Sequence, residues 1–306
     1  MSILGDRIFA RRKISSVQLT KIPGHDFDLA MTLDSGQVFH WEKSGHGFVG
    51  TIGERAVYVE QGRNSLLSSC AEQLVGHYFA LDHPLAEICA SFPNDTAMNA
   101  AREFCRGLRI VRQPKWECLA TFICSSMKQV AHIRQISMKL KGRFGKPRHI
   151  GDLVVHAFPS AERIAASSER ELRKCALGYR AKNLLATARQ IACGDVDLEQ
   201  LAALPDVDLR ARLCELPGVG AKVANCVMLF AYERLRAFPI DVWIERVLRE
   251  KYFPRARKLN AARLRTFTEQ YFGNHGGYAQ QYLFHHARMS KTKTKSGRFV
   301  TSSGVR

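Results

Sequence analysis

Residues 216–222 read LPGVGAK, and this short stretch is the most informative in the chain. Its two glycines, Gly218 and Gly220, allow the backbone to take positive φ values and to turn tightly. The spacing of apolar residues on either side of the turn predicts helices over 206–215 and 219–232. We therefore expect a helix-hairpin-helix whose second helix begins at the glycines, with its unpaired N–H groups facing outward.

A hairpin of this kind can hold a DNA phosphate, because a helix N-terminus presents free donors and the positive end of its dipole. The backbone of Gly218, Val219 and Gly220 would make that contact. Phosphate contacts position a protein on DNA without reading the bases. The hairpin therefore predicts a DNA-binding protein but says nothing about sequence preference.

A lysine and an aspartate stand close to this hairpin. Lys222 lies at the start of the second helix, and residues 238–243 read FPIDVW. Asp241 in that stretch predicts the N-cap of a third helix, with its carboxylate accepting from the N–H of residue 243 or 244. Each residue alone is most simply a surface lysine or an ordinary cap. Behind a hairpin, the pair indicates a lysine nucleophile, which must be neutral to attack, and a carboxylate that assists it.

At these residues the chain resembles the helix-hairpin-helix base-excision DNA glycosylases that have a Gly/Pro-rich loop followed by an aspartate. More narrowly, it resembles the 8-oxoguanine DNA glycosylase/lyase branch of that superfamily. The narrower resemblance rests on five further stretches, which occur in the family order: residues 35–41 (SGQVFHW), 78–82 (YFALD), 122–126 (FICSS), 177–181 (LGYRA) and 277–284 (GYAQQYLF).

Composition agrees with a nucleic-acid partner. The formal net charge is +18 and the sequence pI is about 9.8, so the chain attracts polyanions in a salt-dependent way. The chain has no apolar run long enough for a membrane span and no secretory signal core, so we expect an intracellular protein, in the cytoplasm or nucleoid of a bacterium or the nucleus of a eukaryote. Its nine cysteines form no C-x-x-C pair, which indicates reduced thiols and argues against an iron–sulfur relative of endonuclease III.

The expected fold class is α+β. Apolar residues alternate over 27–33, and strand-like stretches follow at 38–41, 48–52 and 56–59, which predicts an antiparallel meander up to about residue 65. From Asp95 onward the pattern is helical almost throughout. We expect three regions: an N-terminal antiparallel sheet domain (1–92), a mainly helical glycosylase domain (93–290, with the hairpin at about 206–232) and a basic flexible tail (291–306).

The resemblance implies that the damaged base is flipped out of the duplex into a pocket. Phe284 would stack on one face of the base and Cys226 on the other, with Pro239 beside them. Gln280 would hydrogen-bond its Watson–Crick edge, since an amide both donates and accepts. The Gly36 carbonyl would accept from N7–H, which 8-oxoguanine has and guanine lacks. From the residues alone, Phe284 reads as a core aromatic, Cys226 as a buried thiol, Gln280 as a surface glutamine and Gly36 as part of a turn.

The same resemblance implies the reaction. Lys222 attacks C1′ while Asp241 offsets the positive charge that develops there, a Schiff base forms, and elimination of the 3′ phosphate nicks the strand. This chemistry needs no metal or organic cofactor, although a structural cation held by hairpin carbonyls would be compatible with it. The expected partner is double-stranded DNA containing 8-oxoguanine, bound by a monomer.

The chain departs from the best-known branch at the residues that recognise the base opposite the lesion. Met127 stands where that branch has asparagine, and His132 where it has arginine; only Arg180 of the three is kept. Met127 can still act as an apolar wedge in the base stack, with Tyr179 on the other side. We therefore expect looser specificity for the opposite base.

Three other functions remain open at this point. A glycosylase/lyase for other oxidised bases would use the same residues. A monofunctional alkylpurine glycosylase would share the hairpin and Asp241 but typically has no lysine at position 222. A non-enzymatic DNA-binding module would use the hairpin only to grip phosphate.

Overall fold

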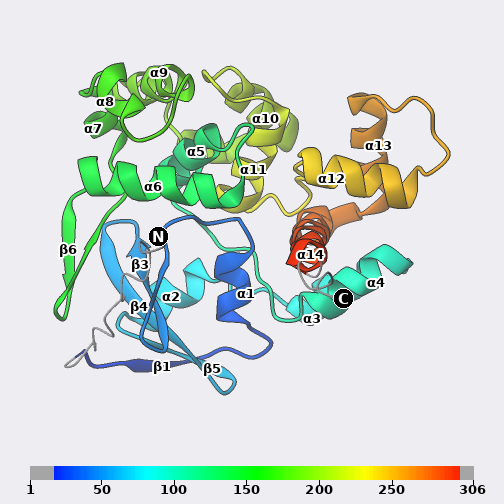
Figure 1. The fold of residues 1–306 in the computed structure, drawn as a ribbon, viewed down its shortest axis with the longest axis horizontal. Coiled ribbons are helices and arrows are strands. Elements are labelled where there is room, and N and C mark those ends of the chain that lie inside the picture. Colours follow the sequence, from blue (N-terminus) through cyan, green and yellow to red (C-terminus); the bar gives the residue numbers. More distant parts are fainter. Residues whose placement is uncertain (1–16, 297–306) are drawn as a thin grey trace, which may run out of the picture.

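The computed structural model describes residues 17–296. Its main sheet is antiparallel and follows the order β1-β5-β4-β3-β2 (Figure 1). The strands are β1 (Thr20–Pro23), β2 (Glu42–Ser44), β3 (Gly47–Ile52), β4 (Arg55–Gly62) and β5 (Ser65–Ser68). β2 to β5 pair consecutively as a meander, and β1 adds to its edge by pairing with β5. The predicted strands at 48–52 and 56–59 are confirmed as β3 and β4.

Helices make up most of the remaining chain. In the N-terminal part they are α1 (Leu29–Asp34), α2 (Glu72–Tyr78), α3 (Leu85–Ala90) and α4 (Thr96–Phe104). The central ones are α5 (Lys115–Cys124), α6 (Val130–Phe144), α7 (Ala161–Ala165), α8 (Glu169–Arg173), α9 (Arg180–Ala192) and the short η1 (Gln200–Ala203). The last are α10 (Asp206–Cys214), α11 (Ala221–Ala231), α12 (Val242–Val247), η2 (Leu248–Tyr252), α13 (Ala261–Tyr271), η3 (Gly273–His275) and α14 (Gly276–Ser296). The predicted α+β class is confirmed.

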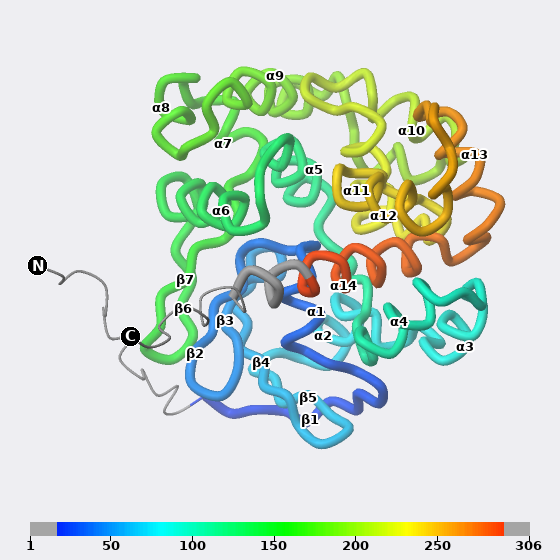
Figure 2. The backbone as a smooth tube through the Cα atoms, turned by 45° about the vertical axis from the view of Figure 1, so that its right-hand side comes forward, coloured from blue at the N-terminus to red at the C-terminus, as the bar shows by residue number. Residues whose placement is uncertain are grey.

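Helix α14 lies between two layers of the molecule. In Figure 2 it runs through the middle, with α5, α6 and α11 on one side and α1, α2 and α4 on the other. One face of α14 is apolar and buried: Tyr278, Ala279, Tyr282 and Leu283 all belong to the helical core. A second core lies between the sheet and α1 and α2, and Trp41 is fully buried there. The C-terminal helix therefore holds the helical layer close to the N-terminal one.

The predicted strand over 27–33 is wrong, because most of this segment forms α1. Asp28 caps that helix, and its carboxylate accepts from the Met31 amide at 2.8 Å. The residues buried on one side of α1 are Leu29, Thr32 and Leu33, which share a helical face at spacings of three and four. The alternation at 27, 29, 31 and 33 was therefore misleading, and the acid before Leu29 was the informative signal.

The predicted strand over 38–41 is also wrong: this stretch is buried but does not pair with the sheet. A side chain from another element satisfies the carbonyl at its end instead: the Trp41 carbonyl accepts from Arg134 at 3.1 Å. The Gln37 carbonyl, just before the stretch, accepts from Gln113 Nε2 at 2.8 Å. Buried backbone groups need partners, but these need not lie on a neighbouring strand. Strand β2 begins only at Glu42.

Two features differ from the expected helical region and tail. A hairpin of β6 (Pro147–Ile150) and β7 (Leu153–His156) interrupts the helices and packs beside the main sheet, where β6 meets β4 and β7 meets β3. Residues 291–296, predicted as flexible, continue α14 as helix. Residues 297–306 of the predicted tail lie outside the described residues.

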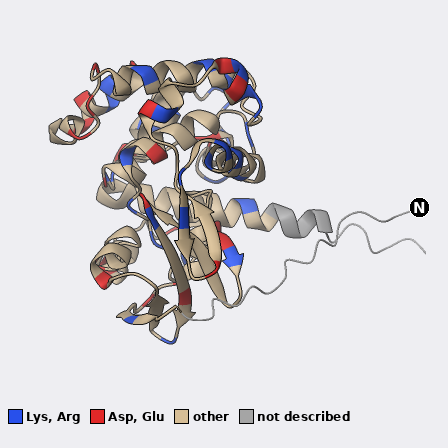
Figure 3. Ribbon diagram, turned by 90° about the vertical axis from the view of Figure 1, so that its left-hand side faces the viewer, with Lys and Arg blue, Asp and Glu red and all other residues tan. Residues whose placement is uncertain are grey.

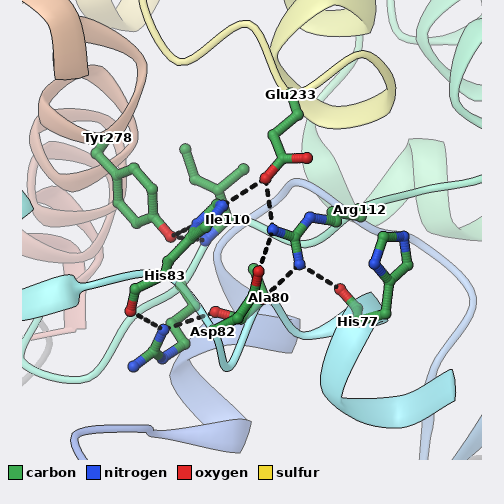
Figure 4. Close-up of polar contacts among 9 residues, drawn as sticks. His77, Ala80, Asp82, His83, Ile110, Arg112, Glu233 and Tyr278 are labelled. Carbon is green, nitrogen blue, oxygen red and sulfur yellow. Dashed lines mark hydrogen bonds and ion pairs between the residues drawn. The ribbon is translucent and has the colours of Figure 1, made fainter. Parts of the chain in front are cut away.

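A polar network ties the segments on either side of α14 together (Figure 4). The Arg112 guanidinium binds Asp82 with both terminal nitrogens, at 2.6 and 2.8 Å, and also binds Glu233 just after α11. The His83 ring lies 2.6 Å from the same Glu233 carboxylate and 2.8 Å from the Tyr278 hydroxyl of α14. This network joins the end of the hairpin's second helix to the N-terminal layer and to α14.

The distribution of charge and the hydropathy of the helices agree with what the sequence predicted. Lys and Arg are interspersed with Asp and Glu over the helices and the sheet, so the positive excess is not confined to one element (Figure 3). No helix among residues 17–296 combines the length and the hydropathy required to cross a membrane. All nine cysteines fall within the described range and are free thiols.

Candidate active site

The predicted hairpin is present between α10 and α11, and its backbone requires a glycine at position 218. Gly218 has a φ of +84°, and a Cβ there would come within 2.8 Å of the Asn183 Cβ. The Pro217 carbonyl accepts from the Thr187 hydroxyl of α9 at 2.9 Å, which fixes the turn. Gly220 is the extended N-cap of α11 and has open space where a side chain would lie. The N-terminus of α11 is therefore open on this side.

Val219 differs from the two glycines that flank it. Its side chain is buried, and its N–H donates to the Leu216 carbonyl at 3.0 Å within the turn. Gly218 and Gly220 line a cavity, whereas Val219 does not. The main-chain donor predicted at Val219 is thus already engaged inside the hairpin.

A cavity of about 1020 Å³ opens where α5, α11, α12 and α14 meet. Ten of the residues predicted for the site line it: Gly36, Met127, Gly218, Gly220, Lys222, Cys226, Pro239, Asp241, Gln280 and Phe284. These residues come from widely separated parts of the chain. The fold therefore assembles the lysine, the aspartate and the expected base-binding residues around one space.

The Lys222 amine lies at the wall of this cavity and is half-buried. Nζ donates to the Ser125 hydroxyl at 3.0 Å and lies 5.0 Å from the centre of the Phe122 ring. Cys226 lies one helical turn further along α11, close enough for the Lys222 amine to act on the pKa of its thiol. Burial raises the pKa of the Cys226 thiol to about 11, so it remains protonated at neutral pH. The Ser125 hydroxyl and the Phe122 ring therefore hold the amine at the start of α11.

Asp241 caps α12 as predicted, and its carboxylate accepts from the Ile244 amide at 2.8 Å. Burial raises the pKa of this carboxyl above the usual range, and the capping bond and the positive charge of Lys222 oppose that rise. The carboxylate faces the same cavity as the amine. A positive charge that develops in the cavity would therefore meet a negative one already held in place.

The expected base-binding residues line the cavity. Gly36 has a φ of +88°, and a Cβ there would come within 3.1 Å of the Phe284 ring. Cys226 is buried, and Phe284 is half-buried. Gln280 is only 4% exposed, and its Oε1 has no hydrogen-bond partner within the described part of the chain. An unpaired buried acceptor costs free energy, so this amide is set up to meet a donor in the cavity.

Several polar residues that the sequence did not single out hold Gly36 in place. Gln281 Nε2 donates to the Ser35 carbonyl at 3.0 Å. The Gln37 side chain donates to the Arg109 carbonyl and accepts from the Val111 amide, both at 2.8 Å. Ser125 beside Lys222 was missed in the same way. Gln37 and Ser125 stand inside motifs that were recognised, but the contacts that give them a role are long-range.

The residues predicted to meet the opposite base lie at different places relative to the cavity. Met127 is 93% exposed at the rim of the cavity, and its φ is +52°. Tyr179 is exposed outside the cavity lining, and the Arg180 guanidinium lies 4.3 Å from its ring centre. Arg180 itself is buried and donates to the Ser126 and Leu177 carbonyls. His132 is exposed and does not line the cavity.

The donor set does not indicate a metal centre. Over residues 17–296, His, Cys, Asp and Glu side chains do not gather in threes at metal-binding geometry. The predicted cation at the hairpin would use main-chain carbonyls instead, and it stays a prediction.

Comparison with known proteins agrees with this arrangement. Residues 19–119 match the 8-oxoguanine DNA glycosylase N-terminal domain, and residues 120–270 match the HhH-GPD superfamily of base excision DNA repair proteins. The N-glycosylase/DNA lyase OGG1 of Arabidopsis thaliana is 32% identical over 86% of this chain and 78% of its own length. The chain belongs to the 8-oxoguanine DNA glycosylase family.

Two further relatives extend this finding. The N-glycosylase/DNA lyase of Saccharomyces cerevisiae is 30% identical, over 78% of this chain and 72% of its own length. A Clostridium acetobutylicum 8-oxoguanine glycosylase/lyase, solved with double-stranded DNA that contains cytosine opposite 8-oxoguanine, superposes on this glycosylase with a TM-score of 0.83. It is 28% identical, and the match covers 89% of this chain and 98% of the other. Lys222 and Asp241 both lie inside the HhH-GPD match.

Proposed function

We propose that this glycosylase removes 8-oxoguanine from double-stranded DNA with Lys222 and Asp241 and then nicks the strand. The chain is a DNA N-glycosylase with DNA lyase activity that acts in base excision repair. One observation carries the residue assignment: a lysine amine and a half-buried carboxylate face the same cavity as an unpaired amide oxygen. A module that only binds DNA would need neither the cavity nor the amine inside it.

Recognition of the lesion depends on the wall formed by Gly36 and Gln280. The flipped base stacks between Phe284 and Cys226, with Pro239 at its edge. The Gly36 carbonyl accepts N7–H of 8-oxoguanine, whereas guanine would place the N7 acceptor against it. That mismatch costs about 1–3 kcal/mol in a buried site. Gln280 Oε1 accepts from the Watson–Crick edge of the base, which satisfies its unpaired oxygen.

The glycosidic bond breaks as the amine attacks. The lone pair of Lys222 Nζ forms a bond to C1′, and the C1′–N9 bond breaks with its electron pair leaving on the base. One N–H proton goes to the departing base. When the sugar ring opens, O4′ takes a proton from water and the remaining N–H stays on the iminium. Asp241 stabilises the positive charge that builds up at C1′ during this step.

Strand cleavage follows from the iminium. The positive nitrogen withdraws electrons from C2′, so a C2′ proton is lost to water. The electron pair of that C–H bond forms a C2′–C3′ double bond, and the 3′ phosphate leaves with the C3′–O bond pair. Hydrolysis then releases the sugar fragment from Lys222.

Duplex DNA binds across the hairpin and the cavity mouth. The open N-terminus of α11 at Gly218 and Gly220 grips a phosphate beside the lesion. Met127 and Tyr179 enter the stack as wedges. Because Arg180 is occupied by main-chain carbonyls and His132 stands away from the cavity, the cytosine opposite the lesion is read loosely.

We further propose that the protein works inside the cell as a monomer. The reaction above uses the amine and the carboxylate alone, without an organic cofactor or a catalytic metal. A structural cation bound by hairpin carbonyls would strengthen the phosphate contact, as the positive end of a helix does.

Borohydride trapping tests the nucleophile. Reduction during turnover on an 8-oxoguanine duplex should link the wild-type protein covalently to DNA, and Lys222→Gln should trap none. Lys128→Gln is the matched control, because Lys128 lines the same cavity but is exposed. Trapping by Lys222→Gln would remove that residue from the reaction. Absence of trapping by the wild type would overturn the proposed lyase chemistry on this lesion.

A further inference from the structure

Ser125 contacts the Lys222 amine from the C-terminal end of α5. It is 5% exposed, and its hydroxyl donates to the Phe122 carbonyl at 2.7 Å. The Lys222 Nζ lies 3.0 Å from the same hydroxyl oxygen. A hydroxyl has one proton to donate and two lone pairs. Because the Phe122 carbonyl takes that proton, Ser125 can only accept from Lys222.

The Cys226 thiol lies beside the same amine. It is four residues after Lys222 on the same face of α11, and the amine opposes the rise of the thiol's pKa. A neutral primary amine carries two N–H bonds and one lone pair. If Ser125 Oγ and Cys226 Sγ each accept one N–H, both N–H bonds of the neutral amine are engaged by the cavity wall, and its lone pair alone stays free to react.

The frame around this amine is rigid. Phe122, whose carbonyl fixes the Ser125 hydroxyl, stacks on Phe230 of α11 with ring centres 5.5 Å apart and planes 9° apart. Its ring also meets Phe39 edge-on at 5.7 Å. Helices α5 and α11 therefore hold the Ser125 acceptor and the Lys222 amine in one orientation, which is what fast attack on a docked substrate requires.

We propose that Ser125 is a positioning residue for the reaction: it accepts one N–H of Lys222 and leaves the lone pair of the amine turned into the cavity. This inference rests on the proposed function, because it takes Lys222 as the nucleophile. Loss of the acceptor lets the neutral amine rotate about its Cε–Nζ bond, so fewer encounters present the lone pair to C1′. Substrate binding does not depend on that rotation.

Ser125→Ala separates these two effects. At saturating enzyme, the rate of borohydride trapping on an 8-oxoguanine duplex should fall by about 3- to 10-fold, the effect of one hydrogen bond. Affinity for a duplex with a tetrahydrofuran abasic analogue, which carries no leaving base, should stay within about 2-fold of wild type. Ser125→Cys keeps the shape with a weaker acceptor, so its trapping rate should lie between those of wild type and Ser125→Ala.

Ser167→Ala is the matched control. Ser167 is also buried, and its hydroxyl donates to the Ile164 carbonyl at 2.7 Å at the end of α7, but it contacts no lysine. It should bind and trap as the wild type does. Equal trapping rates for Ser125→Ala and Ser167→Ala would overturn the role of Ser125, as would a loss of affinity and melting temperature that accounts for the slower trapping. Trapping that survives in Lys222→Gln would instead overturn the assignment of the nucleophile.

Discussion

At the scale of single residues, Asp241 combines two tasks. Its carboxylate accepts from the Ile244 amide at the start of α12, and it faces the cavity that holds Lys222. Burial raises the pKa of this carboxyl, which means that the ionised form is harder to maintain than at an exposed aspartate. In the proposed mechanism the charge is needed only while the glycosidic bond breaks, whereas the cap is needed to build the helix.

Substitution of Asp241 by asparagine separates the two tasks. Asparagine is as good an N-cap as aspartate, so α12 and DNA affinity should be kept. The single-turnover excision rate should fall by about 100-fold or more, because the charge that stabilises the developing cation is gone. Full activity in Asp241→Asn would remove the carboxylate from the mechanism.

Given its raised pKa, the proposed role of Asp241 also predicts an acid limb in the pH profile. The rate should decline as pH falls through that pKa, and therefore at a higher pH than an exposed aspartate would give. Asp241→Asn should lack this limb. Single-turnover rates of both proteins over the acid range provide the measurement.

Gly36 permits a second residue-scale prediction. A methyl group at this position would lie 3.1 Å from the Phe284 ring and 3.2 Å from Val130, on a backbone with φ of +88°. Gly36→Ala should therefore displace the carbonyl that is proposed to face N7, and the ratio of excision rate to duplex affinity should fall by about 10-fold. The ratio of excision rate to duplex affinity measures this effect. An unchanged ratio would show that the Gly36 carbonyl does not select the lesion.

How far the site could be predicted depended on the distance between the contacting residues. The hairpin and the Asp241 cap follow from local patterns, and the resemblance placed Gly36, Gln280 and Phe284 on one cavity with Lys222. The bond from Lys222 to Ser125 joins residues 97 apart, and the bond from Gln281 to Ser35 joins residues 246 apart. No local spacing signals such pairs. The sequence therefore showed that these residues were present, but not which residues they contact.

At the scale of elements, the loop between α5 and α6 carries the expected wedge. Met127 at its tip takes a φ of +52°, which a side chain of this size adopts only when its surroundings hold it. Arg180 supplies such a hold by donating to the Ser126 carbonyl. The loop is therefore held in place by Arg180 at Ser126 and exposed to solvent at Met127.

The composition of this loop predicts a weak preference for the opposite base. A methionine has no polar group to read a base edge, so excision opposite the four bases should differ by about 10-fold at most, within the discrimination of one good base contact. Met127→Ala should slow excision opposite all four bases alike. Val207→Ala, another exposed apolar residue, on α10, is the control that should change nothing. Strict dependence on cytosine would contradict this interpretation.

The elements that were predicted wrongly have two physical causes. Residues 27–33 alternate in polarity and also present a helical face, and the Asp28 cap decides between the two. Residues 38–41 are buried and mostly apolar, but they do not pair with the sheet, and Arg134 of α6 donates to the Trp41 carbonyl at their end. The β6–β7 hairpin is short and depends on packing beside the main sheet. A local cap decided the first case, and tertiary contacts decided the other two.

At the scale of the whole molecule, the network around Arg112 should contribute to global stability. Arg112→Met would leave the Asp82 and Glu233 carboxylates without their shared donor, and unfolding free energy at neutral pH should fall by about 1–3 kcal/mol. Thermal or urea unfolding measures this loss. Arg173→Met, which removes an exposed pair with Glu169 on α8, is the control and should cost less than about 1 kcal/mol.

The contribution of this network depends on pH in a defined direction. Hydrogen bonding to Arg112 lowers the pKa of Asp82 to about 2, below its value in the unfolded chain. Stabilisation from this carboxylate is therefore complete above about pH 4 and is lost as pH falls toward 2. The difference between wild type and Arg112→Met should shrink over that interval. A difference that stays constant would mean that the ion pairs contribute nothing measurable.

Helix α14 is synthesised after every other described element, and it carries Gln280 and Phe284. A ribosome that has released residues up to 275 has already delivered Lys222, Asp241 and the Gly36 carbonyl proposed to distinguish the lesion, but not the two residues proposed to hold the flipped base. Neither the helical core nor the cavity is closed at that stage. Translation order thus completes the proposed base pocket and the fold together, so a prematurely terminated chain would lack both the stability and the means to hold a base.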